Sequence, residues 1–117
     1  MIRKLVRAAL PLTVALSLAA GFAAAEEPKT DLGRWMKPNM GAPLAGQDFD
    51  ALQKSLTLVA SKPPPGSYPN WASMAKDGAA AAAKQDVKGV KASCKACHDA
   101  YKKSYQTDFP DKKRPFP

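Results

Sequence analysis

Cysteine and histidine are scarce in this chain, and the few that occur are adjacent. The 117 residues include two cysteines, Cys94 and Cys97, and one histidine, His98. A structural zinc site takes about four cysteine or histidine ligands, so these three side chains do not complete one. Any chemistry that needs a thiol or an imidazole must therefore use this one short run near the C-terminus.

The chain also lacks the alternation of apolar and polar residues that is typical of strands. A thioredoxin-type dithiol uses Cys-x-x-Cys beside a strand–helix–strand pattern, so that interpretation loses support but stays open. A structural disulfide between Cys94 and Cys97 also stays open for an exported protein. Bridging two residues three apart in a helix is strained, however, which counts against it.

The run itself reads Cys94-Lys95-Ala96-Cys97-His98, and Cys-x-x-Cys-His is the attachment signature of a covalent c-type haem. Two helical cysteines three apart share a face, so both thiols can reach the edge of one flat ring and form thioethers. His98 follows directly and can ligate the iron as proximal ligand. The sequence therefore predicts one covalent haem c, with its iron, held by Cys94, Cys97 and His98.

The N-terminus reads as a secretory signal peptide. Residues 1–7 are basic, residues 8–22 are apolar, and Ala23-Ala24-Ala25 offers a small-residue cleavage site. We expect cleavage after Ala25 and export to the bacterial periplasm. An uncleaved anchor is the alternative, although the uncharged stretch of 18 residues is at the short limit for spanning a bilayer. No cysteine lies near the cleavage point, which excludes a lipid-anchored lipoprotein.

Removal of this peptide leaves one small domain, residues 26–117. A domain of this size buries a limited core, so a covalent haem would add much of its interior, and we expect the apoprotein to be poorly folded. The net charge of +8 falls to +5 when the three basic leader residues are removed. Nucleic acid is not expected as a partner of an exported chain without a binding motif.

Lysines surround the haem run. They either form a positive face that steers an acidic redox partner or belong to an ordinary solvated helix surface. These residues are Lys88, Lys91, Lys95, Lys102 and Lys103.

Apolar spacing predicts four helices. The first covers residues 30–40, with Thr30 or Asp31 as N-cap, and Pro38 predicts that it is short or bent or that it starts later. Residues 40–43 are expected to turn the chain, and continuation of the helix through them is the alternative. The second helix follows Asp48 as N-cap, carries an apolar stripe, and ends before the proline-rich residues 63–66.

The third helix covers residues 71–85, with Asn70 as its N-cap. Its run of glycine and alanine at 78–83 either leaves room for a flat ligand or permits a close helix–helix contact. The fourth helix begins at Asp86 or Val87, and the haem cysteines lie on its apolar stripe. The tail, residues 111–117, is charged and proline-bearing and is expected to be frayed. The pattern predicts an all-α fold, an antiparallel four-helix bundle with covalent haem on the C-terminal helix.

Two stretches resemble the class II cytochromes c, which include cytochromes c′ and the low-spin c-556 type. Residues 92–102 are similar to the last helix of that family, although Lys102 stands where the family usually has arginine. Residues 34–41 resemble the family's first helix, which faces the sixth coordination site of the iron.

The resemblance implies two functions, depending on that sixth site. If Met36, or alternatively Met40, ligates the iron, the protein is a low-spin carrier of single electrons between redox proteins and is not an enzyme. If neither methionine does so and both are core fillers, the five-coordinate haem binds small gases such as nitric oxide or carbon monoxide. Both a monomer and a homodimer are compatible with the family.

Four more residues are candidates for haem contacts. Arg34 either pairs with a haem propionate or is simply exposed. Trp35, Trp71 and Tyr101 either pack on the ring or belong to the ordinary apolar core.

Overall fold

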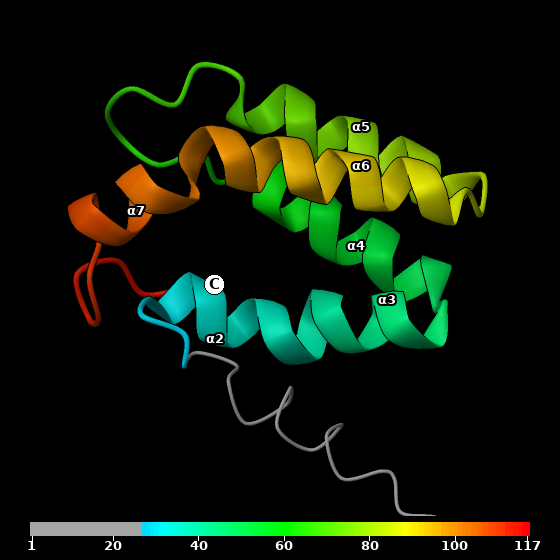
Figure 1. The fold of residues 1–117 in the computed structure, drawn as a ribbon, viewed down its shortest axis with the longest axis horizontal. Coiled ribbons are helices and arrows are strands. Elements are labelled where there is room, and N and C mark those ends of the chain that lie inside the picture. Colours follow the sequence, from blue (N-terminus) through cyan, green and yellow to red (C-terminus); the bar gives the residue numbers. More distant parts are fainter. Residues whose placement is uncertain (1–26) are drawn as a thin grey trace, which may run out of the picture.

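The computed structural model describes residues 27–117, so the predicted signal peptide lies outside the described residues. Helices are the only regular elements in this range, and they form four helical segments (Figure 1). The first segment consists of α2 (Asp31–Met36), η1 (Lys37–Gly41) and α3 (Ala42–Gly46). The next two are α4 (Phe49–Ala60) and α5 (Trp71–Ala83), and the fourth consists of α6 (Val87–Cys97), η2 (His98–Lys102) and α7 (Lys103–Asp108). The predicted all-α class is confirmed. Within residues 27–117, no helix combines the length and apolar character that crossing a membrane requires.

The first helical segment is longer than the sequence predicted. Thr30 is its N-cap, because its hydroxyl accepts a hydrogen bond from the Gly33 amide at 2.9 Å. The turn expected at residues 40–43 is not formed, and the alternative holds: the helix continues to Gly46 and ends at Gln47, whose φ is 54°. The middle turn, η1, is a π-helix in which the Ala42 amide bonds to the carbonyl of Lys37, five residues back. This wider turn accommodates Pro38, which has no amide hydrogen to donate.

The other predicted caps mark helix starts, with one difference. Asp48 accepts from the Ala51 amide at 3.1 Å and begins α4, and Asp86 accepts from the Gly89 amide at 3.0 Å and begins α6. Asn70 precedes α5 as expected, yet its side chain makes no cap hydrogen bond. Its backbone amide instead donates to the Tyr101 hydroxyl at 2.8 Å, which ties the start of α5 to η2.

The small residues of α5 serve close helix packing. α5 packs on both α4 and α6, and a Cβ atom added at Gly78 would lie 2.8 Å from Ser93 Oγ and 3.2 Å from Leu56 Cδ1. Distances below 3.0 Å are not tolerated without a shift of one group. Of the two interpretations of residues 78–83, the close helix–helix contact therefore describes this structure.

The first segment packs differently, since it contacts α4 through η1 and α3 and buries Leu32 of α2 in the core. The interior is divided into two clusters. One gathers around Trp71, Tyr101 and Tyr105 near the α7 end, and the other gathers around Leu52 and Val90. 

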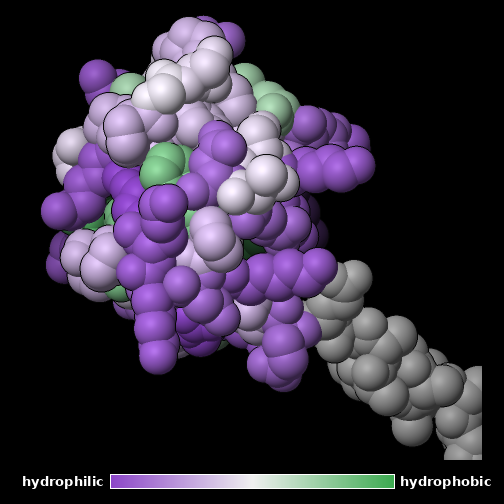
Figure 2. Space-filling model, turned by 90° about the vertical axis from the view of Figure 1, so that its left-hand side faces the viewer, coloured by the Kyte–Doolittle hydropathy of each residue, from purple (hydrophilic) through white to green (hydrophobic). Residues whose placement is uncertain are grey.

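The C-terminal tail is not frayed, which corrects the expectation from its composition. Residues 109–117 turn back toward the start of α2 (Figure 1), and Arg114 donates to the Tyr105 hydroxyl and to the Lys62 carbonyl, both at 2.8 Å. Phe116 packs edge-on against Trp35, with ring centroids 4.8 Å apart. Figure 2 shows that the end of the molecule formed by α7 and this tail is mainly hydrophilic, with scattered apolar residues.

Candidate functional site

A cavity of about 410 Å³ lies between the first and fourth helical segments. Its walls come from α2, η1 and α3 on one side and from α6, η2 and α7 on the other. Leu56 and Val59 of α4 and Trp71 and Ala75 of α5 form the floor between them. The lining is mostly apolar, and the volume is within the range of roughly 300–1,000 Å³ that is usual for ligand pockets.

Seven of the nine residues singled out from the sequence line this one cavity. They are Met36, Met40, Trp71, Cys94, Cys97, His98 and Tyr101. They come from three helical segments that are far apart in the sequence. The spacing of the motif alone could not predict that the two methionines share a cavity with it.

The other two predicted residues, Arg34 and Trp35, are not among the lining residues. The guanidinium of Arg34 forms an ion pair with Asp111 at 2.8 Å and a second ion pair with Asp31. Trp35 contacts Phe116 of the tail. Both side chains therefore connect the first helix to the C-terminal tail in this structure.

Cys94 and Cys97 lie in the last two turns of α6, half-buried and not bridged to each other. Cys94 packs against the cluster that contains Leu52 and Val90, whereas Cys97 packs against the one that contains Trp71 and Tyr101. Burial raises the pKa of both thiols, because a thiolate is poorly solvated there. Both are therefore protonated at neutral pH, unlike the activated thiolates of dithiol oxidoreductases.

His98 lines the cavity although much of its surface is accessible. Partial burial lowers the pKa of its imidazole, and the positive charge of Lys102 lowers it further, while Asp99 opposes the shift. The ring is consequently neutral at pH 7, which is the form that ligates metals.

Two π-helical turns, η1 and η2, contribute to opposite walls of the cavity. η1 contains Met40, and η2 begins at His98 and contains Tyr101, which is 9 % exposed. π-helical turns are rare and occur often at functional sites. Pro38 was a sequence signal for the first of them, whereas the sequence around His98 contains no comparable signal for the second.

The two methionines have different neighbours. Met36 packs only against the cluster around Trp71, Tyr101 and Tyr105, which we call the aromatic cluster. Met40 packs against both clusters. Both side chains are half-buried. Met74 of α5 packs on the aromatic cluster and is not among the lining residues.

Cationic side chains also line the cavity, and sequence reasoning did not assign them to it. Lys37 belongs to η1 and Lys102 to η2, so one is contributed by each wall. The only signals in the sequence were that Lys37 follows Met36 and that Lys102 lies on the predicted helix that carries the Cys-x-x-Cys-His motif. Within residues 27–117, no three histidine, cysteine or acidic side chains come together in a way that could hold a metal ion.

Comparisons with protein-family models, curated proteins and solved structures found no match. The assignment of a ligand therefore depends on the cavity itself. The chemistry of its lining suits an apolar group with a ligated iron: two half-buried thiols and a neutral imidazole lie on one wall, and two thioethers lie on the other. Lys37 and Lys102 add positive charge that suits carboxylates at the edge of such a group.

Proposed function

We propose that this protein is a monohaem c-type cytochrome of the class II type that carries single electrons between redox proteins. The observation that supports this most strongly is the shared cavity of Cys94, Cys97 and His98 with Met36 and Met40. When bound, the haem supplies an iron centre that gains or loses one electron.

In this proposal, Cys94 and Cys97 hold the haem by two thioethers, and His98 ligates its iron from the same helix. Met36, or alternatively Met40, supplies the second axial ligand. The thioether is a neutral, soft ligand that favours ferrous iron and raises the reduction potential. The apolar floor formed by Leu56, Val59 and Ala75 excludes water from the site, which adds to the same preference.

The finer architecture and the cellular setting belong to the same proposal. The four helical segments form an antiparallel bundle, with the haem on the C-terminal helix. The protein acts in the bacterial periplasm after removal of residues 1–25, as a monomer or a homodimer. Its partners are redox proteins, and the lysines near the motif favour acidic ones.

A second candidate function is the binding of small gases at an open sixth site. Two observations favour it. Both methionines are half-buried, and the helical segment that carries them packs on α4 through η1. A loosely placed thioether leaves the iron accessible to carbon monoxide or nitric oxide. The thiol–disulfide oxidoreductase is a remote alternative, and the raised pKa of both thiols counts against it.

Optical spectra of the protein matured in a host that attaches c-type haem test the proposal. We expect low-spin bands in both oxidation states and the long-wavelength sulfur-to-iron band in the ferric protein. Met36→Leu or Met40→Leu should abolish that band, while Met74→Leu, on the same apolar cluster as Met36, should preserve it. A leucine fills nearly the same volume, so all three variants should fold.

Each other outcome identifies a different function. High-spin spectra and rapid carbon monoxide binding in the parent protein would favour the gas binder. Absence of covalent haem, with two thiols titratable after reduction, would reject both haem functions and favour the oxidoreductase.

A further inference from the structure

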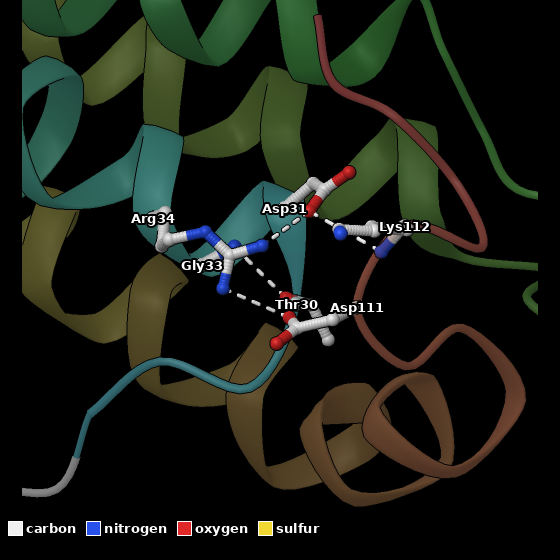
Figure 3. Close-up of polar contacts among 6 residues, drawn as sticks. All are labelled: Thr30, Asp31, Gly33, Arg34, Asp111 and Lys112. Atoms are coloured by element: carbon white, nitrogen blue, oxygen red, sulfur yellow. Dashed lines mark hydrogen bonds and ion pairs between the residues drawn. The ribbon is translucent and has the colours of Figure 1, made fainter.

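The start of the first helix is connected to the fourth helical segment by the C-terminal tail, which we call the strap (residues 109–117). Figure 3 shows Asp111 and Lys112 of the strap beside Thr30, Asp31 and Arg34 at the start of α2. Elsewhere, Leu32 of α2 is buried in the aromatic cluster, and the segment packs on α4 through η1 and α3, further along its length. The strap therefore contacts the part of this helix that lies farthest from its junction with α4.

Three kinds of contact join the strap to α2. Arg34 Nη1 donates to Asp111 Oδ1 at 2.8 Å, and Asp31 Oδ1 accepts from the Lys112 amide at 3.4 Å. The ring of Phe116 meets that of Trp35 edge-on, at 4.8 Å between centroids and 65° between planes. The ion pair is exposed and individually weak, so the ring contact provides the apolar part of the attachment.

Arg114 fastens the other side of the strap. Its two terminal nitrogens donate to the Tyr105 hydroxyl on α7 and to the Lys62 carbonyl after α4. Its guanidinium also lies 5.8–5.9 Å from the ring centroids of Tyr105, Phe109 and Phe116. The strap thus connects α7 to α2. These two elements belong to opposite walls of the cavity: α2 begins the wall formed by the first segment, and α7 ends the wall formed by the fourth.

We propose that the strap sets the position of the first helix over the cavity, with Arg34 and Trp35 as positioning residues. Neither side chain lines the cavity, but both lie on the helix that carries Met36. Release of the strap would let α2 move away from η2 and α7. This inference builds on the proposed function, because the helix so positioned supplies the methionine side of the haem site.

The test compares two variants of the full-length protein matured with haem. Asp111→Ala/Phe116→Ala removes both side-chain contacts of the strap with α2. The matched control Lys113→Ala removes a charge from the same segment, at an exposed side chain. Amide hydrogen exchange of α2 and of α5 is measured in each, together with the rate at which carbon monoxide binds the ferrous protein.

The double variant should exchange about tenfold faster in α2, equivalent to about 1.4 kcal/mol, and only slightly faster in α5. Carbon monoxide should also bind faster, whether or not a methionine must first be displaced. Lys113→Ala should match the parent in both measurements. Unchanged exchange in α2, an equal rise in α2 and α5, or an unchanged binding rate would overturn the positioning role.

The failure of the proposed function is a separate result. A parent protein without covalent haem would overturn that function, and the exchange comparison would still decide whether the strap holds α2.

Discussion

The two sides of the proposed haem site are held together in different ways. On the motif side, α6 packs on α5 and α5 on α4, and a Cβ atom added at Gly78 of α5 would lie 2.8 Å from Ser93 Oγ and 3.2 Å from Leu56 Cδ1. On the methionine side, the first segment contacts α4 through η1 and α3, Leu32 of α2 is buried in the aromatic cluster, and the strap joins its start to the last segment. One side depends on close packing between long helices, and the other depends on the buried Leu32, the contact of η1 and α3 with α4, and the strap near a chain end.

This difference matches what the two sides must do in the proposed function. The cysteines and the histidine need a fixed wall, because covalent attachment at two points tolerates little movement. A thioether ligand needs only to reach the iron, and its helix can move without loss of the attachment. Small changes around the first helix would therefore alter the occupancy of the sixth site while the haem stays bound.

The largest effect should follow from removing the covalent attachment. Cys94→Ser/Cys97→Ser should lose all covalent haem, seen as the loss of one haem mass on intact-protein mass spectrometry. Without the haem, the apolar lining of the cavity of about 410 Å³ would be exposed to water, which is unfavourable for a small domain with a limited core. We expect the cavity to collapse and the first helix to detach.

Hydrogen exchange would localise that loss. Exchange should rise strongly in α2 and much less in α5, because α5 keeps its contacts with α4 and α6. Equal loss of protection in both helices would mean that the two sides do not differ in their dependence on haem.

The next effect tests the closely packed side. Gly78→Leu places a side chain where a Cβ atom alone would lie 2.8 Å from Ser93 Oγ, so the overpacking should cost about 1–3 kcal/mol in urea unfolding. Ala80→Leu is the matched control, since Ala80 is exposed on the same helix. A Gly78 variant as stable as the control would show that α5 and α6 can separate without cost.

The sequence predicted the motif side better than the methionine side. The apolar stripe of the last helix led correctly to its buried face, because Val90, Tyr101 and Tyr105 all proved to be buried. Local caps such as Asp48 and Asp86 were also predictable, since the carboxylate bonds an amide three residues away. These features depend only on residues close in sequence.

The methionine side depends on contacts between residues far apart in the sequence. Proline and charge in residues 111–117 suggested fraying, but Asp111 meets Arg34 across 77 positions of the chain. Residues 40–43 suggested a turn, but η1 accommodates Pro38 by widening the helix rather than ending it. Arg34 was left open between a propionate partner and a simply exposed side chain, because its distant partner Asp111 could not be recognised from the sequence.

A pH-dependent effect should appear where the aromatic cluster connects the loop after α4 to α7. Burial raises the pKa of Tyr68 to about 12, and the hydrogen bond that its hydroxyl donates to Asp108, at 2.7 Å, raises it as well. The folded state favours the neutral phenol, so this stabilisation is complete below about pH 10 and is lost as the pH approaches 12.

Tyr68→Phe should therefore lower the unfolding free energy at pH 8 by about 1–2 kcal/mol, below the full linkage value because Asp108 is exposed. The difference between parent and variant should shrink between pH 10 and 12. A difference that stays constant over this range would mean that the phenol titrates normally in the folded protein.

The smallest effect should come from the solvent side of α6. Lys95 and Asp99 form an ion pair at 2.7 Å, one helical turn apart, and both side chains are more than half exposed. Exposed pairs of this kind contribute about 0.3–0.5 kcal/mol, so Lys95→Ala should shift urea unfolding by no more than that. Lys91→Ala, an exposed charge on the same helix with the ion pair left intact, is the control for charge alone. If Lys95→Ala alone lowers the free energy of unfolding by more than about 1 kcal/mol, the solvent-facing side of α6 helps to hold this helix in place beside the cavity. The expected small loss means that the buried contacts of α6 with α5 hold it instead.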